Sequence, residues 1–251
     1  MANNLALAEQ AAAFARGRPD YPEAAEDWLR VDLGIGEGSR ALDLGSGTGK
    51  FLPRLLATGA DVLAVEPLGE MRRHLTARFP DVEAVAGTAQ AIPLPDGSVD
   101  AVICAQCFHL FATSQALSEI RRVLKPGGAL GLIWNIRDAR VPWVAEIIEI
   151  MAPYDTWPPG WEAMAWRKAF PAVGFGPLAE RQFQNLHKGP PETVIVDRVL
   201  SVSAIAELPP AERESVVAQL RALIARTPEL AGRPQVSFPN VTYAYGCPVS
   251  G

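Results

Sequence analysis

A glycine-rich turn between a short apolar run and a helical pattern constrains this chain more than any other feature. The run Ala41–Leu44 has the character of a buried strand, and the turn Gly45–Gly49 follows it directly. Because glycine has no Cβ and tolerates positive φ, such a turn lets the backbone approach a ligand closely. The helix predicted from Phe51 onwards would direct its free N–H groups at that ligand. This order of elements indicates a nucleotide-type site in an α/β fold.

The residues in and around the turn can be compared with two known glycine motifs. A phosphate-binding P-loop needs glycine where Leu44 stands and Ser or Thr where Phe51 stands, so that motif is excluded. The dinucleotide fingerprint has its third glycine where Lys50 stands, which leaves a degraded match. Asp43 also places a negative charge where a dinucleotide phosphate would be unwelcome. A cationic or amine-bearing ligand suits this turn better.

A second acid ends the next predicted strand, Asp61–Glu66. Doubly wound folds place a carboxylate about 20 residues past the glycines, where it accepts hydrogen bonds from ribose hydroxyls. Glu66 falls in that window. Nicotinamide enzymes and other adenosine-binding enzymes share this feature. It therefore supports a ligand that contains adenosine but does not distinguish between these enzyme classes.

Five segments, in the right order, resemble the class I S-adenosylmethionine-dependent methyltransferases, and the resemblance covers about residues 16–246. They are Arg18–Pro22, similar to the family's lead-in; Asp43–Gly49, similar to its first motif; Gly87–Leu94, similar to the loop along adenine; Val99–Phe111, similar to a small-molecule subgroup; and Lys125–Gly128, similar to the turn before the fifth strand. In the third segment Thr88 stands where the family usually has an Asp that bonds the adenine amino group. A threonine hydroxyl can also accept a hydrogen bond.

The resemblance implies S-adenosylmethionine as the cofactor and assigns the residues that would bind it. These are Arg18, Asp43, Gly45, Ser46, Gly47, Thr48, Gly49, Glu66, Met71, Thr88, Ala89, Gln90 and Gln106. On the acceptor side, His109 is the candidate catalytic residue, either as a base or as a group that only orients the acceptor. Trp134 and Asn135, at the end of the fifth strand, are candidates for lining the acceptor pocket.

The resemblance also implies an α/β fold with a doubly wound, Rossmann-like sheet of seven mostly parallel strands, an antiparallel C-terminal strand, helices on both faces and a helical cap. Residue patterns predict strands at 41–44, 61–66, 83–86, 99–104, 129–134, 178–187 and 235–245, and helices at 5–14, 24–33, 113–124, 191–200 and 209–226. We expect one methyltransferase domain over residues 1–251, in which helices of residues 1–35 cover the cofactor site.

An aromatic-rich segment, residues 140–171, follows the fifth predicted strand. It contains Trp143, Trp157, Trp161 and Trp166. In an open α/β sheet the ligand crevice lies outside the carboxyl ends of the strands, where this insertion emerges. We expect a lid that holds the acceptor, with Trp157 and Trp161 in contact with it. The alternative is that these aromatic side chains only hold the helices of the segment together.

Composition narrows the possible partners. A net charge of −5 argues mildly against a nucleic-acid substrate, and Arg121, Arg122 and Lys125 are interpreted as the cationic end of a helix. No apolar run approaches the roughly 18 residues of a membrane span, and the first residues do not resemble an export signal, so we expect a cytoplasmic location. Cys104 and Cys107 have no second pair of zinc ligands and are predicted to be small buried residues, with no metal.

The function that fits these features is methyl transfer from S-adenosylmethionine to a small molecule. The rival enzyme class is a nicotinamide-dependent oxidoreductase, which Asp43 and the missing third glycine disfavour. A rival of another kind is a non-catalytic S-adenosylmethionine-binding module. The acceptor atom (O, N or C), the need for a base and the oligomeric state stay open.

Overall fold

A computed structural model of the protein describes residues 17–154 and 165–250. The chain contacts divide it into two compact units, which are described separately here. Among the described residues, the core unit comprises residues 21–135, 165–183 and 242–250, and the helical unit comprises residues 17–20, 136–154 and 184–241. A single methyltransferase domain over residues 1–251 stays a prediction. The predicted helix at residues 5–14 lies outside the described residues.

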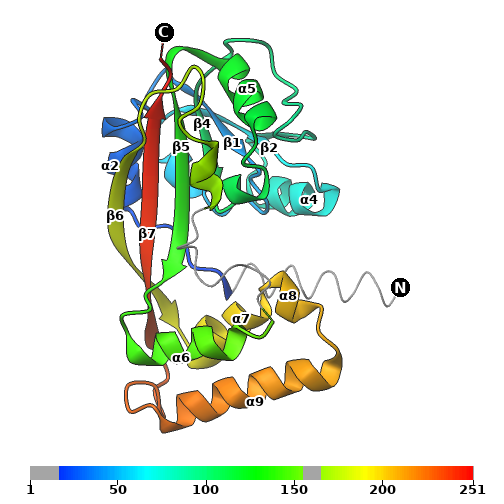
Figure 1. The fold of residues 1–251 in the computed structure, drawn as a ribbon, viewed down its shortest axis with the longest axis vertical. Helices are drawn as coiled ribbons and strands as arrows, with labels where there is room; N and C mark the ends of the chain where they lie inside the picture. The colour runs from blue at the N-terminus through cyan, green and yellow to red at the C-terminus, as the bar shows by residue number, and fades with distance from the viewer. Residues whose placement is uncertain (1–16, 155–164, 251) are drawn as a thin grey trace. The chain divides into compact units, whose positions relative to one another are not determined.

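Seven strands form one sheet in the order β3-β2-β1-β4-β5-β7-β6 (Figure 1). The strands are β1 (Arg40–Leu44), β2 (Asp61–Val65), β3 (Glu83–Val85), β4 (Val99–Ala105), β5 (Leu124–Arg137), β6 (Ala179–Gly189) and β7 (Val236–Pro248). All pairs from β3 to β5 are parallel. In Figure 1 the arrow of β7 points against those of β5 and β6 on either side of it. The predicted doubly wound sheet with an antiparallel C-terminal strand is therefore confirmed.

The helices also match the predicted ranges within a few residues. They are α2 (Ala24–Val31), α3 (Leu52–Leu56), α4 (Gly69–Arg78), α5 (Ser114–Val123), α6 (Pro142–Met151), α7 (Arg198–Leu200), α8 (Ser203–Ala206) and α9 (Pro210–Arg226), with the 3-10 turns η1 (Phe108–Leu110) and η3 (Ala165–Ala169) and the π-helical turn η4 (Glu192–Asp197). Thr113 caps α5, because its hydroxyl accepts from the backbone N–H of Ala116. Within the described ranges, no helix combines the length and the apolar character that crossing a bilayer requires.

In the core unit, α2, α3 and α4 pack against one face of the sheet. The buried side chains of this layer include Trp28, Leu29, Leu52, Leu55 and Leu75 from the helices and Ala41, Ala101, Ile103, Ala129 and Ile133 from the strands. A Cβ on Gly131 would lie 2.9 Å from Trp28, so this close packing requires glycine. Because side chains alternate along a strand, Asp43 points to the same face as Ala41.

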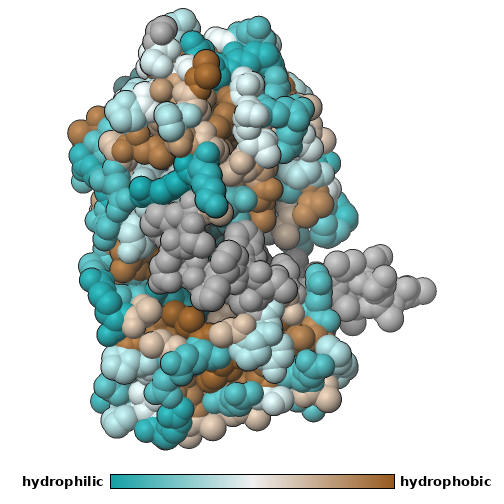
Figure 2. Space-filling view, viewed as in Figure 1, coloured by the Kyte–Doolittle hydropathy of each residue, from teal (hydrophilic) through white to brown (hydrophobic). Residues whose placement is uncertain are grey.

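The helical unit has a hydrophobic core of its own. It is formed by buried side chains of α6, η4, α7 and α9 and of the start of β7, among them Val144, Ile147, Val194, Leu220 and Phe238. The edge of Trp143 packs against Phe238, with 5.2 Å between the ring centroids. On the face drawn in Figure 2, hydrophilic and hydrophobic residues are mixed over the coloured surface. The segment between β6 and β7 is helical, as predicted.

Candidate functional site

The glycine turn lies at the carboxyl edge of two paired parallel strands. Leu44 at the end of β1 stands opposite Val65 at the end of β2, and the N–H of Gly45 donates to the carbonyl of Val65 at 2.8 Å. Three glycines of the turn have positive φ: 72° at Gly45, 55° at Gly47 and 77° at Gly49. The register therefore brings the turn and Glu66, which follows β2, to the same point of the sheet.

The three glycines meet different surroundings. A Cβ on Gly45 would lie 2.9 Å from the sulfur of Cys107, and one on Gly49 would lie 2.9 Å from Leu52. A Cβ on Gly47 would meet no atom of the described residues within 4 Å. The outer glycines are therefore required by packing within the protein, whereas Gly47 faces open space that a ligand can use.

Glu66 holds the turn in place. Its carboxylate is nearly buried, and its two oxygens accept hydrogen bonds from the N–H groups of Gly47 and Leu68, each at 2.9 Å. The first bond reaches the glycine turn and the second reaches the residue before α4. Each carboxylate oxygen retains a second lone pair, so these bonds leave Glu66 able to accept from a ligand hydroxyl.

Asp43 is the least satisfied polar residue of the site. Its side chain is fully buried, and neither carboxylate oxygen has a hydrogen-bond partner among the described residues. Burial, and then the nearby charge of Glu66, raises the pKa of Asp43 to about 7. The hydroxyl of Ser46, in the turn itself, is also buried and has no hydrogen-bond partner in the described part of the chain. Buried polar groups normally find partners, so this acid and hydroxyl suit a ligand that brings positive charge and N–H donors.

The predicted adenine loop begins beside Glu66, because the N–H of Glu66 donates to the carbonyl of Val85 at the end of β3. Thr88 forms an isolated bridge with Ala91, which closes a tight turn around Ala89 and Gln90. Ala89 is buried, Gln90 is half-buried and Thr88 is exposed. The loop thus presents the Thr88 side chain to solvent, where its predicted bond to adenine stays a prediction.

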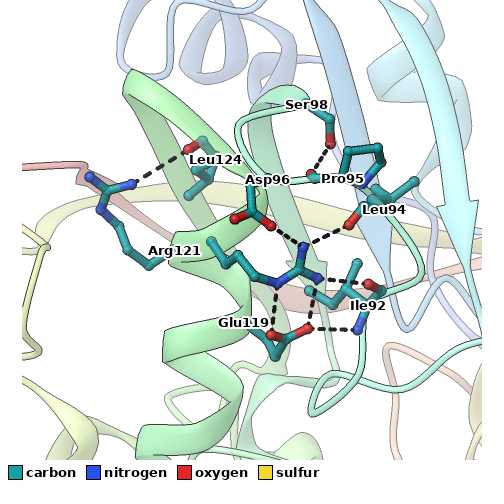
Figure 3. A network of polar contacts seen from close by, with 9 residues as sticks. Ile92, Leu94, Pro95, Asp96, Ser98, Glu119, Arg121 and Leu124 are labelled. Atoms are coloured by element: carbon teal, nitrogen blue, oxygen red, sulfur yellow. Dashed lines mark hydrogen bonds and ion pairs between the residues drawn. The ribbon is translucent and has the colours of Figure 1, made fainter.

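Arg122 on α5 fixes the next part of this loop (Figure 3). Its guanidinium donates to the carbonyls of Ile92 and Leu94 and to the carboxylates of Asp96 and Glu119, at 2.7–2.9 Å. Glu119 also accepts from the N–H of Ile92 at 3.0 Å. Arg122 lies in the last turn of α5, which confirms its interpretation as part of the cationic end of a helix, and these bonds are an additional role. The Glu119–Arg122 spacing, three residues apart on one helix, was the available signal for an ion pair.

Gln106 and His109 follow β4. Gln106 adopts φ 63°, which is uncommon outside glycine, and its side-chain amide donates to the carbonyl of Asn135 at 3.1 Å. His109 lies in η1, where its Nδ1 accepts a hydrogen bond from the indole N–H of Trp134 at 3.1 Å. Burial lowers the pKa of His109 to about 4. A neutral imidazole that accepts at Nδ1 carries its proton on Nε2.

Aromatic rings surround Trp134, the hydrogen-bond partner of His109. Trp134 is 1% exposed and stacks on Trp166, with 4.8 Å between the ring centroids. Tyr245 packs edge-on against both indoles, and the guanidinium of Arg167 lies 4.8 Å from the Tyr245 ring. Asn135 is also buried, and its side-chain oxygen accepts from Thr242 at 2.5 Å. Trp134 and Asn135 are therefore packed inside the core unit, and a direct contact with an acceptor stays a prediction.

The remaining predicted residues are placed as follows. Thr48 is buried within the glycine turn, and Met71 is half-buried on α4. Arg18 belongs to the helical unit, where it hydrogen-bonds to Ser201. Trp157 and Trp161 lie outside the described residues. The structure thus brings together Asp43, the turn and Glu66, and separately links Gln106, His109, Trp134 and Asn135 through hydrogen bonds.

The cysteines are buried free thiols, as predicted. The thiol of Cys107 donates to the carbonyl of Leu44 at 3.1 Å. Its hydrogen bond with Cys104, together with burial, holds the pKa of Cys107 well above its usual value. Over residues 17–154 and 165–250, no three His, Cys, Asp or Glu side chains gather in a way that could bind a metal ion.

Residues 42–132, from β1 into β5, match the family described as "Methyltransferase domain". A methyltransferase-like protein of Schizosaccharomyces pombe is 40% identical over 241 residues, which is 92% of this chain and 91% of the relative. A methyltransferase of Mycobacterium tuberculosis is 38% identical over 239 residues, covering 95% and 93%. The fold is similar to that of a candidate type II methyltransferase from Anaeromyxobacter dehalogenans, with a TM-score of 0.64, 23% identity and coverage of 92% and 96%. The chain therefore belongs to the class I S-adenosylmethionine-dependent methyltransferase family.

Proposed function

We propose that this protein transfers the methyl group of S-adenosylmethionine to a small-molecule acceptor. The observation that carries the proposal is Asp43, a fully buried carboxylate without a partner among the described residues, beside the open space at Gly47. S-adenosylmethionine carries a sulfonium and an ammonium group, so it offers the positive charge that this acid needs. A dinucleotide phosphate would instead be repelled.

The neighbouring groups suit the rest of that molecule. Glu66 retains lone pairs for ribose hydroxyls while it holds the turn, and Thr88–Gln90 form a turn at a place suited to adenine. Arg122 anchors the chain that follows this turn, so the loop is supported before a cofactor binds. Sites that are formed in advance bind without a large ordering penalty.

The sulfonium is already an activated methyl donor, so the chain's own residues mainly align the acceptor and exclude water. In this proposal His109 orients the acceptor through a donor at Nε2, because the Trp134 bond occupies Nδ1 and the imidazole stays neutral. The Trp134 bond thus favours the orienting role over the role of a base, the two roles that the sequence left open. A base at this position would require the imidazole nitrogen lone pair that Trp134 occupies.

The finer features of the proposal concern the residues around the acceptor and the segments that cover the two ligands. Trp157 and Trp161 would contact it, residues 140–171 would act as a lid, and residues 1–35 would cover the cofactor. The described tryptophans of that segment, Trp143 and Trp166, pack into the cores of different units, as the alternative interpretation expects of structural aromatics. Charge and sequence favour a cytoplasmic enzyme without a nucleic-acid substrate.

Titration calorimetry with four ligands tests the cofactor. S-adenosylmethionine and S-adenosylhomocysteine should bind, and NAD and ATP should not. Asp43→Asn should weaken S-adenosylmethionine more than S-adenosylhomocysteine, since only the former has the sulfonium charge. Asp61→Asn, at the exposed start of β2, is the matched control. Heat from NAD alone would favour the oxidoreductase alternative.

A second experiment tests whether the protein catalyses methyl transfer. Metabolite pools incubated with the protein and methyl-labelled S-adenosylmethionine should yield a labelled small molecule. Cofactor binding without any labelled product across such pools would favour a non-catalytic binding module.

A further inference from the structure

The helical unit contains a group of three arginines, of which the resemblance assigned only Arg18 to the cofactor. Arg18 comes from the chain before α2, Arg137 from the end of β5, and Arg198 from the first position of α7. The charges of Arg18 and Arg137 both act on Arg198. Arg198 therefore lies close enough to two guanidinium groups from distant parts of the sequence to be affected by their charges.

Arg198 is the buried member of this group. It is 4% exposed, and its Nε and Nη1 have no hydrogen-bond partner among the described residues. Burial, and then the positive charges of Arg18 and Arg137, holds the pKa of Arg198 well below its usual value. An arginine does not lose its proton in proteins, so a buried guanidinium in this position needs a counter-charge.

The surrounding chain keeps the group together. Arg18 donates to the hydroxyl and the carbonyl oxygen of Ser201, at 3.1 and 3.2 Å, and the Ser201 hydroxyl donates to the carbonyl of Arg198 at 2.7 Å. A Cβ on Gly17 would lie 2.7 Å from the backbone of Asp197 and Arg198. The chain at Gly17 and Arg18 thus runs directly against the turn that carries Arg198.

We propose that Arg18, Arg137 and Arg198 form a site in the helical unit for the oxyanion of a small molecule, a carboxylate or a phosphate. The planar fork of a guanidinium matches both groups and binds them through paired N–H donors. The unused Nε and Nη1 of Arg198 provide donors that the protein leaves unsatisfied. An oxyanion at this point accepts from those atoms and offsets the effect of the Arg18 and Arg137 charges on Arg198.

Calorimetry and thermal unfolding of the full chain with two probes, inorganic phosphate and succinate, test the site at constant ionic strength. Constant ionic strength keeps the screening of surface charges equal in every sample. Wild type should bind at least one probe saturably and unfold at a higher temperature in its presence. Stronger binding of succinate identifies a carboxylate ligand, and stronger binding of phosphate identifies a phosphate ester.

Arg198→Gln and Arg137→Gln should each weaken the preferred probe about 10- to 100-fold, the range for loss of charged hydrogen bonds. Arg137 is half-buried, so its variant keeps the test valid if Arg198→Gln fails to fold. Arg221→Gln is the matched control, because Arg221 is exposed and paired with Glu192 in the same unit. No saturable binding of either probe, or equal binding by all variants, overturns the proposal.

Discussion

The indole N–H of Trp134 donates a hydrogen bond to Nδ1 of His109 at 3.1 Å, and this bond links strand β5 to the turn that follows the neighbouring strand β4. The register places Ala105, the last residue of β4, opposite Ile133 of β5, so the chain that follows β4 lies beside Trp134. Trp134 is held in turn by Trp166 and Tyr245. The imidazole therefore has a fixed tautomer, with its proton on Nε2.

Trp134→Phe should remove the constraint on the His109 tautomer. The ring is retained but the N–H donor is lost, so His109 can carry its proton on either nitrogen. Nitrogen-15 NMR of the imidazole should show one tautomer in wild type and a mixture in the variant. Trp28→Phe is the control, because the Trp28 indole nitrogen is buried without a partner and makes no such bond. A mixed tautomer in wild type would contradict the assignment.

His109→Gln should keep much of the methyl-transfer activity if His109 only donates a hydrogen bond. A glutamine amide can donate but cannot take up a proton at neutral pH. His109→Ala should lower kcat by about tenfold, the equivalent of one hydrogen bond of ~1.4 kcal/mol. Loss of activity by a factor on the order of 10²–10⁴ in both variants would instead indicate a general base.

Asp43 and His109 should give opposite pH dependences of stability. The pKa of His109 falls from 6.5 to about 4, so the stability that its neutral form contributes is complete above pH 6.5 and is lost as the pH falls towards 4. The pKa of Asp43 rises from 3.8 to about 7, so its contribution is complete below pH 3.8 and is lost as the pH rises through 7. Between about pH 4 and 6.5 the two effects oppose each other.

Urea unfolding from pH 4.5 to 7.5 separates the two groups. Relative to wild type, Asp43→Asn should lose stability on acidification, because only the His109 effect remains. His109→Gln should gain stability on acidification, because only the Asp43 effect remains. Differences from wild type remove the contributions of the other titrating groups. Parallel pH profiles for all three proteins would mean that neither pKa is shifted as described.

Much of the cofactor side could be predicted because its signals are local in sequence. The glycine turn, Asp43 and the strand ending at Glu66 each depend on a few adjacent residues. The parallel register of β1 and β2 then brings them together without further information. The bonds from Gly47 and Leu68 to Glu66 are a refinement that no motif describes.

The acceptor side was less predictable because its contacts depend on packing between distant residues. Trp134 was expected to line a pocket, yet it is buried against Trp166 and bonded to His109. Arg18 hydrogen-bonds to Ser201, 183 residues further along the chain, and its contact with the cofactor stays a prediction. Neither partner can be read from a motif, because both arise only when the chain folds.

Binding of S-adenosylmethionine should release a proton near neutral pH. Asp43 has a pKa of about 7 in the free protein, so a substantial fraction is protonated there, and a positively charged ligand favours the ionised form. Affinity should therefore fall as the pH drops below 7 and level off above it. Calorimetry in buffers of different ionisation enthalpy measures the released proton. Asp43→Asn should abolish the buffer dependence, and a persisting dependence would assign the proton to another group.

Gly47 and Gly97 provide a matched pair for testing the position of the cofactor. Their φ values are 55° and 56°, and a Cβ on either would meet nothing within 4 Å. Substitution by alanine should therefore cause a similar backbone strain at each site, on the order of 1 kcal/mol of unfolding free energy. Only Gly47 lies in the glycine turn, which follows Asp43 and is bonded to Glu66. Gly97 lies in the loop before β4.

Gly47→Ala should weaken S-adenosylmethionine by at least tenfold, because the added methyl group enters the space assigned to the ligand. Gly97→Ala should lose a similar amount of stability and bind with almost unchanged affinity. Urea unfolding and calorimetry on both variants make the comparison. The double comparison removes backbone strain as an explanation, since strain is common to both. Equal affinities for the two variants would place the cofactor away from the glycine turn.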